Sequence, residues 1–100
     1  MKFDLIIRNA QIIDGSGEPA YCADLAVSAG LIAAIGNLAA AEAYSVHYAQ
    51  GLVVAPGFID VHTHDDLQVI HAPTMLPKIS QGITTVIVGN CGISASPVTL

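Results

Sequence analysis

Positive charge is the scarcest property of this sequence. Three Lys and Arg residues stand against eight Asp and Glu residues, the formal net charge is −5, and charged residues make up 11% of the 100 residues. Without a cluster of Lys and Arg to neutralise phosphates, the chain has no electrostatic footprint for nucleic acid or for an anionic lipid surface. Hydrophobic residues reach 53%, and with so few charges to cover the surface we expect a large face that contacts further protein.

Long hydrophobic runs and cysteines are also scarce. Residues 25–41 and 79–100 carry no charge, but Gly, Ser and Asn interrupt both stretches, so neither gives the roughly 18 apolar residues of a transmembrane helix. Arg8 stands in the sequence before any signal-peptide hydrophobic region develops. Two cysteines, Cys22 and Cys91, make no disulfide framework. We therefore expect a protein of the reducing cytoplasm without a membrane span.

Short strand patterns dominate the first half of the chain. Segments rich in β-forming residues alternate with turn signals, among them the Ala29-Gly30 pair. This pair predicts a hairpin over residues 22–36. We expect residues 1–55 to form a small β-sheet or half-sandwich domain.

The pattern changes after Gly57. Residues 58–64 and 83–89 predict two strands, and a short helix is expected over 75–81 between them. Apolar residues on both faces of the second segment are typical of a parallel strand buried on both sides. Residues 58–89 together have the length of one βαβ unit.

The strongest chemical signal is His62-Thr63-His64. Residues i and i+2 of a strand project to the same face, so the two imidazoles are expected to point one way and Thr63 the other. Such a pair can hold a divalent metal through its ring nitrogens. The plain alternative is two histidines hydrogen-bonded to loop carbonyls at a strand end.

Cys91 follows the second predicted strand. Parallel strands of a βαβ unit end at the same edge of the sheet, so the thiol is expected beside the two imidazoles. As a thiolate it could ligate one ion or bridge two. The alternative is a buried free cysteine that only packs.

Four neighbouring polar residues are secondary candidates. Asp60 could orient an imidazole through a hydrogen bond, or serve as a buried structural carboxylate. Asp65 and Asp66 could bind metal or a substrate amine, although a role in loop structure is favoured. Asn90 could contact substrate or cap a loop.

These residues lie in longer motifs that resemble the amidohydrolase superfamily. Residues 55–66 (APGFIDVHTHDD) are similar to its metal-binding opening, and residues 77–86 followed by 89–94 (GNCGIS) resemble the D-aminoacylase, or N-acyl-D-amino-acid deacylase, branch. The similarity runs through nearly the whole chain. In that branch the cysteine takes the metal-bridging place that a carboxylated lysine holds elsewhere. The resemblance implies His62, His64 and Cys91 as ligands of zinc, with one or two divalent ions in the parent enzyme.

The resemblance also implies an α/β parent several times longer than this chain. Its small β-domain would pack on a TIM-like (β/α)₈ barrel, which needs roughly 250 residues, and residues 56–100 would be the incomplete start of that barrel. We therefore expect an N-terminal fragment that is itself β-rich and needs the remainder of its own chain. Further histidine ligands and the aspartate that shuttles protons would lie downstream, so no catalytic residue is expected here.

The activity implied is metal-dependent hydrolysis of the non-peptide C–N bond of N-acyl-D-amino acids, which releases a carboxylate and a D-amino acid. The isolated fragment is expected to be inactive and to form oligomers or domain-swapped species through exposed strand edges.

Two other functions stay open at this point. A cyclic-amide hydrolase of the dihydroorotase or hydantoinase kind would use a lysine bridge from a later strand and leave Cys91 merely packed. A non-catalytic β-rich assembly module would have structural histidines and no stoichiometric metal.

Overall fold

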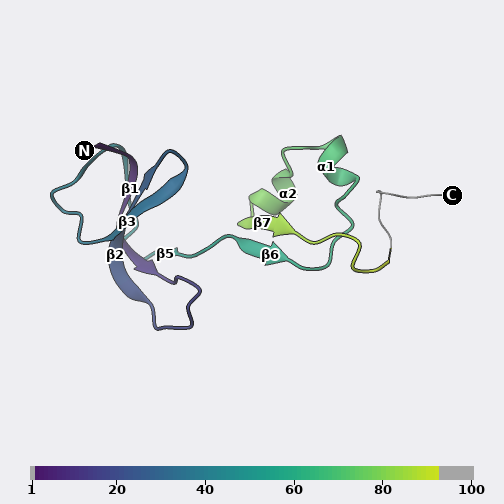
Figure 1. The fold of residues 1–100 in the computed structure, drawn as a ribbon, viewed down its shortest axis with the longest axis horizontal. Coiled ribbons are helices and arrows are strands. Elements are labelled where there is room, and N and C mark those ends of the chain that lie inside the picture. The colour runs from purple at the N-terminus through teal and green to yellow at the C-terminus, as the bar shows by residue number, and fades with distance from the viewer. Residues whose placement is uncertain (1, 93–100) are drawn as a thin grey trace. The chain divides into compact units, whose positions relative to one another are not determined.

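The computed structural model describes residues 2–92 of the chain. The chain folds as two compact units, Met1–Pro56 and Gly57–Leu100 (Figure 1). The first unit is a β-sheet. The second consists of two short strands, which pair with each other, and two short helices. The expected β-rich fold class is confirmed.

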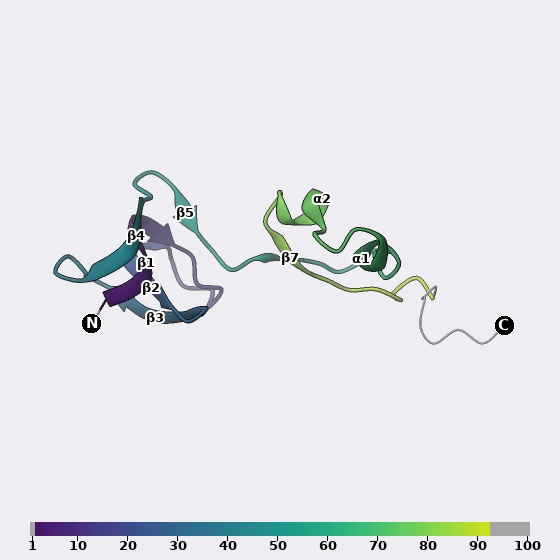
Figure 2. The same ribbon diagram turned by 90° about the horizontal axis from the view of Figure 1, so that it is seen from above.

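The sheet of the first unit is built around one long central strand (Figure 2). Its elements are β1 (Lys2–Ile12), β2 (Tyr21–Ser28), β3 (Leu31–Gly36), β4 (Glu42–Tyr48) and β5 (Val53–Val54). The order is β3-β2-β1-β4, and β5 also pairs with β1. β1 runs antiparallel to β2 and parallel to β4 and β5. The N-terminal part of β1 pairs with β4, and its C-terminal end pairs with β5. β2 and β3 form the predicted hairpin, with positive φ at Ala29 and Gly30 in the turn.

A bulge in β1 determines which residues face the core. Before the bulge Ile7 lies opposite Leu25, and after it Ala10 lies opposite Ala23. Asn9 in the bulge has φ 59°, a left-handed conformation that asparagine tolerates better than most residues. The core consists of Ala10, Ile12, Leu25 and Ala49, with Ile7, Ala23, Val27 and Val54 packed against them. The extra residue thus lets Ile7 before the bulge and Ala10 and Ile12 after it pack in the same cluster.

A buried carboxylate holds this bulge and the loop that follows β3. Asp24 accepts hydrogen bonds from the Asn9 N–H at 2.9 Å and the Leu38 N–H at 3.1 Å, and Arg8 approaches it at 3.3 Å. Arg8 also donates to the carbonyl oxygens of Leu38 and Ala41. The Asn9 N–H, the Leu38 N–H and Arg8 lower the pKa of Asp24, against desolvation, which raises it. The network fixes one end of the sheet.

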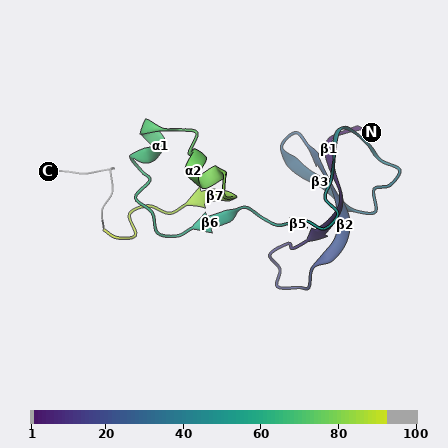
Figure 3. The ribbon, with the colours of Figure 1, turned by 180° about the vertical axis from the view of Figure 1, so that it is seen from behind.

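The second unit is a short βαβ unit. β6 (Phe58–Asp60) and β7 (Ile83–Val86) pair in parallel, and α1 (Gln68–His71) and α2 (Leu76–Ile79) lie between them in sequence. Figures 1 and 3 show both helices on one side of the strand pair. A Cβ atom on Gly57 would collide with the Thr84 side chain, so glycine allows the close approach at the start of the pair.

The predicted strands over 58–64 and 83–89 are too long. The strands end at Asp60 and Val86. Directly after β6 the Asp60 carboxylate accepts a hydrogen bond from the His62 N–H at 3.3 Å, which favours a bend over a continued strand. Hydrogen bonds from the Ile87 N–H to the Asp60 carbonyl and from the Thr63 N–H to the Ile87 carbonyl still link the two segments. The two strands therefore end four and three residues earlier than the apolar pattern suggests.

The predicted helix over 75–81 is also shorter than expected. α2 spans four residues with Pro77 in its first turn, and Ser80 closes it. Gly82 has φ +82° and lies two positions beyond Ser80, the C-cap residue. Neither helix among residues 2–92 is long and apolar enough to cross a bilayer.

Candidate metal centre

Three metal-binding side chains converge where the segments after β6 and β7 meet. One ligand atom from each of His62, His64 and Cys91 lies within 4.8 Å of the other two, and all three side chains are exposed. The two imidazole rings have centroids 5.8 Å apart and are inclined at 63°. Among the described residues, this is the group of three side chains that can hold a metal ion.

The two histidines point the same way because the residue between them is anchored inward. Thr63 is 5% exposed, and its hydroxyl and N–H both donate to the Ile87 carbonyl, at 3.2 and 3.1 Å. The alternation expected of a strand therefore persists beyond the strand. The prediction that His62 and His64 belong to a strand is wrong, because β6 has already ended at Asp60.

A tight turn presents Cys91 on the other side. Gly89 and Gly92 have φ angles of 76° and 83°, which glycine adopts without a steric penalty, and the Gly92 N–H donates to the Gly89 carbonyl at 3.0 Å. The Asn90 side-chain amide donates to the Val61 carbonyl at 3.0 Å. Asn90 thus ties the cysteine turn to the histidine segment.

Asp60, for which the sequence left open a bond to an imidazole or a structural role, contacts Lys78 and the main chain. Its carboxylate accepts a hydrogen bond from the Lys78 ammonium at 2.7 Å and another from the His62 main-chain N–H. The Lys78 hydrogen bond lowers the pKa of Asp60, and the same bond raises the pKa of Lys78. Among the described residues, the Asp60 carboxylate therefore binds the main chain of His62 and the Lys78 ammonium.

Asp65 and Asp66 begin the segment that leads into α1. The Asp65 side chain is 16% exposed and lies 3.4 Å from the Lys78 ammonium. Its Oδ2 atom is buried and accepts no hydrogen bond from the described residues. The Asp65 carbonyl accepts the Val69 N–H at 2.8 Å, and Asp66 helps to line a hollow between the helices and β7. The Asp65 carbonyl thus takes part in the turn that leads into α1.

Lys78 is the functional candidate that sequence reasoning missed. It is the only Lys or Arg in residues 57–100, and the structure pairs it with both Asp60 and Asp65. Its isolation among three aspartates was a usable signal.

The donor set fits zinc. Two imidazole nitrogens and a thiolate are ligands that zinc prefers, and tetrahedral bonds of about 2.0–2.3 Å place donor atoms about 3.5 Å apart. Because the three side chains are exposed, small rotations bring their donor atoms from the present spacing to that one. Three protein ligands leave a coordination position for water or substrate.

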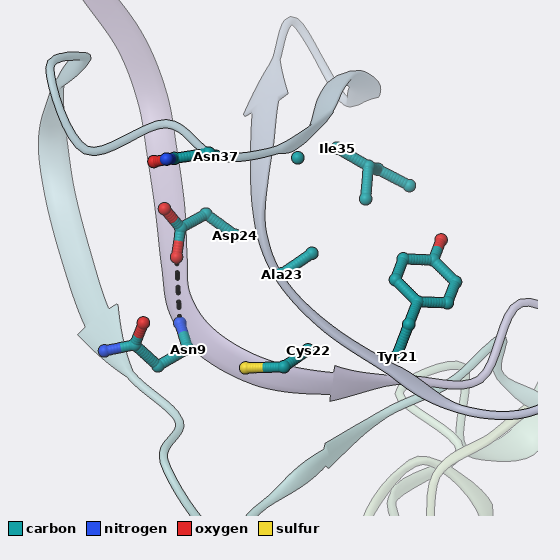
Figure 4. A pocket seen from close by; sticks show the side chains of 8 residues that line it. Asn9, Tyr21, Cys22, Ala23, Asp24, Ile35 and Asn37 are labelled. Atoms are coloured by element: carbon teal, nitrogen blue, oxygen red, sulfur yellow. Dashed lines mark hydrogen bonds between the residues drawn. The ribbon is translucent and has the colours of Figure 1, made fainter.

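A hollow in the first unit offers no comparable chemistry (Figure 4). Asp24 lies in it, but its carboxylate is already bound by Asn9, Leu38 and Arg8. Cys22 is exposed at the same place. The carboxylate is structural, and the cysteine stands without the two imidazoles that accompany Cys91.

Comparisons with known proteins identify the family of this chain. The model of the amidohydrolase family matches residues 47–99. Over 94 residues the chain is 57% identical to N-acyl-D-aspartate deacylase of Alcaligenes xylosoxydans xylosoxydans, which covers 94% of this chain and 19% of that protein. Over 95 residues it is 55% identical to D-aminoacylase of the same organism, which covers 95% of this chain and 20% of that protein. The chain thus spans about a fifth of the length of these curated relatives.

A solved structure extends the similarity to three dimensions. N-acyl-D-glutamate deacylase from Bordetella bronchiseptica, crystallised with zinc and a phosphonate that mimics the tetrahedral reaction intermediate, matches with a TM-score of 0.92 at 55% identity. The match covers all of this chain and 21% of that one. The chain belongs to the amidohydrolase family and, within it, to the branch of the D-aminoacylases.

Proposed function

We propose that the protein is a zinc-dependent hydrolase that cleaves N-acyl-D-amino acids into a carboxylate and a free D-amino acid. The observation that carries the proposal is the convergence of His62, His64 and Cys91 to within 4.8 Å. Relatives of more than 50% identity that are named as deacylases of N-acyl-D-amino acids support the substrate class.

In this proposal the residues of the chain hold the ion and orient its ligands. His62 and His64 supply neutral ring nitrogens, and Cys91 supplies a thiolate that ligates one ion or bridges two. When bound, zinc polarises a carbonyl oxygen and makes a coordinated water more acidic. We assign no nucleophile or general base to these residues, and place the proton transfer on an aspartate elsewhere in the whole protein.

We also propose how the two segments serve the whole enzyme. Residues 1–55 would form part of a small β-domain, and residues 56–100 the first βαβ part of a (β/α)₈ barrel. The parallel pairing of β6 with β7 and the position of the ligands beyond the carboxyl ends of these strands support this division, because barrel enzymes place their active sites at that edge.

The partners follow from the same proposal. The substrate is a small molecule, and the remainder of the protein completes the site. We further propose that the 100-residue chain on its own pairs with other copies through the edges of β6 and β7, because a two-stranded sheet offers edges for further pairing. A reducing cytoplasm suits an exposed thiol ligand.

The position of Cys91 favours a deacylase over a cyclic-amide hydrolase. The cyclic-amide alternative leaves this cysteine packed, whereas its side chain is exposed and beside both imidazoles. The same geometry disfavours an assembly module with purely structural histidines.

The test uses the full-length protein, stripped of metal and reloaded with zinc. We expect hydrolysis of the N-acetyl derivatives of D-aspartate, D-glutamate or an apolar D-amino acid, at least one of them, and no comparable hydrolysis of the L-enantiomers. We also expect at least one tightly bound zinc per chain. Zinc-loaded protein that leaves all these D-substrates intact, or that cleaves hydantoin or dihydrouracil faster, would overturn the proposal.

A further inference from the structure

Lys78 connects the two ends of the segment that carries both histidines. The ammonium group lies 2.7 Å from Asp60 Oδ2 and 3.4 Å from Asp65 Oδ2. Asp60 is the last residue of β6, and Asp65 directly follows His64. One cation from α2 therefore holds the residues on either side of positions 61–64.

These contacts lie in a partly enclosed environment. The side chains of Lys78, Asp60 and Asp65 are 25%, 28% and 16% exposed. Asp65 Oδ2 is buried and accepts no hydrogen bond from residues 2–92, so the ammonium is the positive charge that offsets its burial. Without Lys78, two carboxylates would face each other across the same space, and like charges at short range repel.

The cluster also reaches the ligands themselves. The second oxygen of Asp60 accepts the main-chain N–H of His62. His64 and Lys78 line the same small hollow beside Asp65. Lys78 itself is not a metal-binding group, because an ammonium has no lone pair to donate.

We propose that Lys78 is a positioning residue for the zinc site, which fixes the His62–His64 segment by holding Asp60 and Asp65 together. This inference rests on the proposed zinc site and deepens it. Outer partners that orient metal ligands typically change metal affinity or activity about 10–100-fold when removed. An ion pair that only supported the fold would leave zinc affinity unchanged once the protein is folded.

The experiment compares Lys78→Met, which keeps the aliphatic stem, with Lys78→Arg, which keeps the positive charge, in the full-length protein. Lys2→Met is the matched control, because Lys2 lies on β1 over the Tyr44 ring in the other unit. The zinc dissociation constant is measured by competition with a chromophoric chelator. Hydrogen exchange of the amides of residues 61–66 and the melting temperature are measured on the metal-free protein.

We expect K78M to weaken zinc binding by at least about tenfold and to speed exchange at residues 61–66, while the melting temperature stays close to that of the wild type. K78R is expected to recover most of the affinity, and K2M to match the wild type in every measurement. In the zinc-saturated enzyme K78M should lower kcat more than it raises KM, because the ligands rather than the substrate are displaced.

The outcomes separate the two proposals. A wild-type protein that binds no zinc overturns the proposed function. Hydrogen exchange at residues 61–66 then tests on its own whether Lys78 fixes the segment that carries the histidines. Zinc affinity of K78M within twofold of the wild type, or unchanged exchange at residues 61–66, overturns the positioning role. So does an affinity loss that only tracks the melting temperature across the variants.

Discussion

The two units of the chain are held together in different ways. In Met1–Pro56, Ile6 and Ile12 are 0% and 3% exposed. In the described part of Gly57–Leu100, Thr63 is the one buried residue, while Phe58 and Val61 are each 62% exposed. The first unit has its own apolar core. The second has hydrogen bonds and ion pairs around the candidate metal site, and its large apolar side chains are mostly exposed.

Both units contain a basic side chain bound to carboxylate, with different consequences. Arg8 joins Asp24 to a loop of the first unit, far in sequence from the candidate ligands. Lys78 joins Asp60 and Asp65 on either side of the histidines. The first pair should therefore govern stability, and the second should govern metal binding.

The largest contrast is expected between the two cysteines. Cys91→Ala removes a proposed ligand, so zinc affinity and deacylase activity should fall by more than the roughly 10–100-fold that loss of an outer partner costs. Cys22→Ala, in the other unit, should leave both unchanged. Zinc content and steady-state kinetics of the full-length protein measure the effect, and equal retention of zinc by both variants would contradict it.

The next contrast is between two aspartates. Asp24→Asn should lower the free energy of unfolding by about 1–3 kcal/mol. The amide nitrogen of asparagine cannot accept a hydrogen bond, so one of the main-chain N–H groups or Arg8 loses the partner that the carboxylate now provides. Asp60→Asn should instead weaken zinc binding and leave the denaturation midpoint of the metal-free protein nearly unchanged. Denaturant titration with a parallel zinc competition assay measures both, and the reverse pattern would refute the division of roles.

Gly57 tests how closely β6 approaches β7. Gly57→Ala should destabilise the second unit by about 1–3 kcal/mol, because the new Cβ meets the Thr84 side chain and forces it aside. Faster hydrogen exchange at residues 58–60 and 83–86, with no change in β1 and β2, is the expected signature. Adding Thr84→Gly should restore slow exchange, and a failure to restore it would place the strain elsewhere.

The smallest expected effect is a dependence on pH. The folded-state pKa of Asp24 is lowered below 3.8, first by the Asn9 N–H and then by Leu38 and Arg8. A lowered pKa gives stability that is present in full above the unfolded pKa and disappears as pH falls through the folded value. The stability difference between wild type and Asp24→Asn should therefore be constant from pH 5 to 7 and shrink below about pH 4. A difference that grows on acidification would have the wrong sign.

The sequence predicted those features that short-range patterns determine. The Ala29-Gly30 turn adopts positive φ at both residues and makes the predicted hairpin. The parallel pairing of β6 and β7 follows from a βαβ pattern of the right length, and it brings the segments with His62 and Cys91 to one edge.

Features that depend on distant partners were not predictable. The bulge at Asn9 relies on a carboxylate 15 residues away, and β4 pairs in parallel with β1 across two intervening strands. Lys78 reaches Asp60 over 18 residues. Periodicity describes which face of an element is apolar and carries no information about such long-range polar contacts, so the strand ends and the lysine were missed.

X-ray absorption at the zinc edge of the intact, zinc-loaded protein tests the central claim most directly. If His62, His64 and Cys91 hold the ion, the spectrum shows one sulfur at about 2.3 Å and imidazole nitrogens at about 2.0–2.1 Å, and the sulfur shell disappears in Cys91→Ala. A zinc shell that contains only nitrogen and oxygen, or a sulfur that remains in that variant, would contradict it.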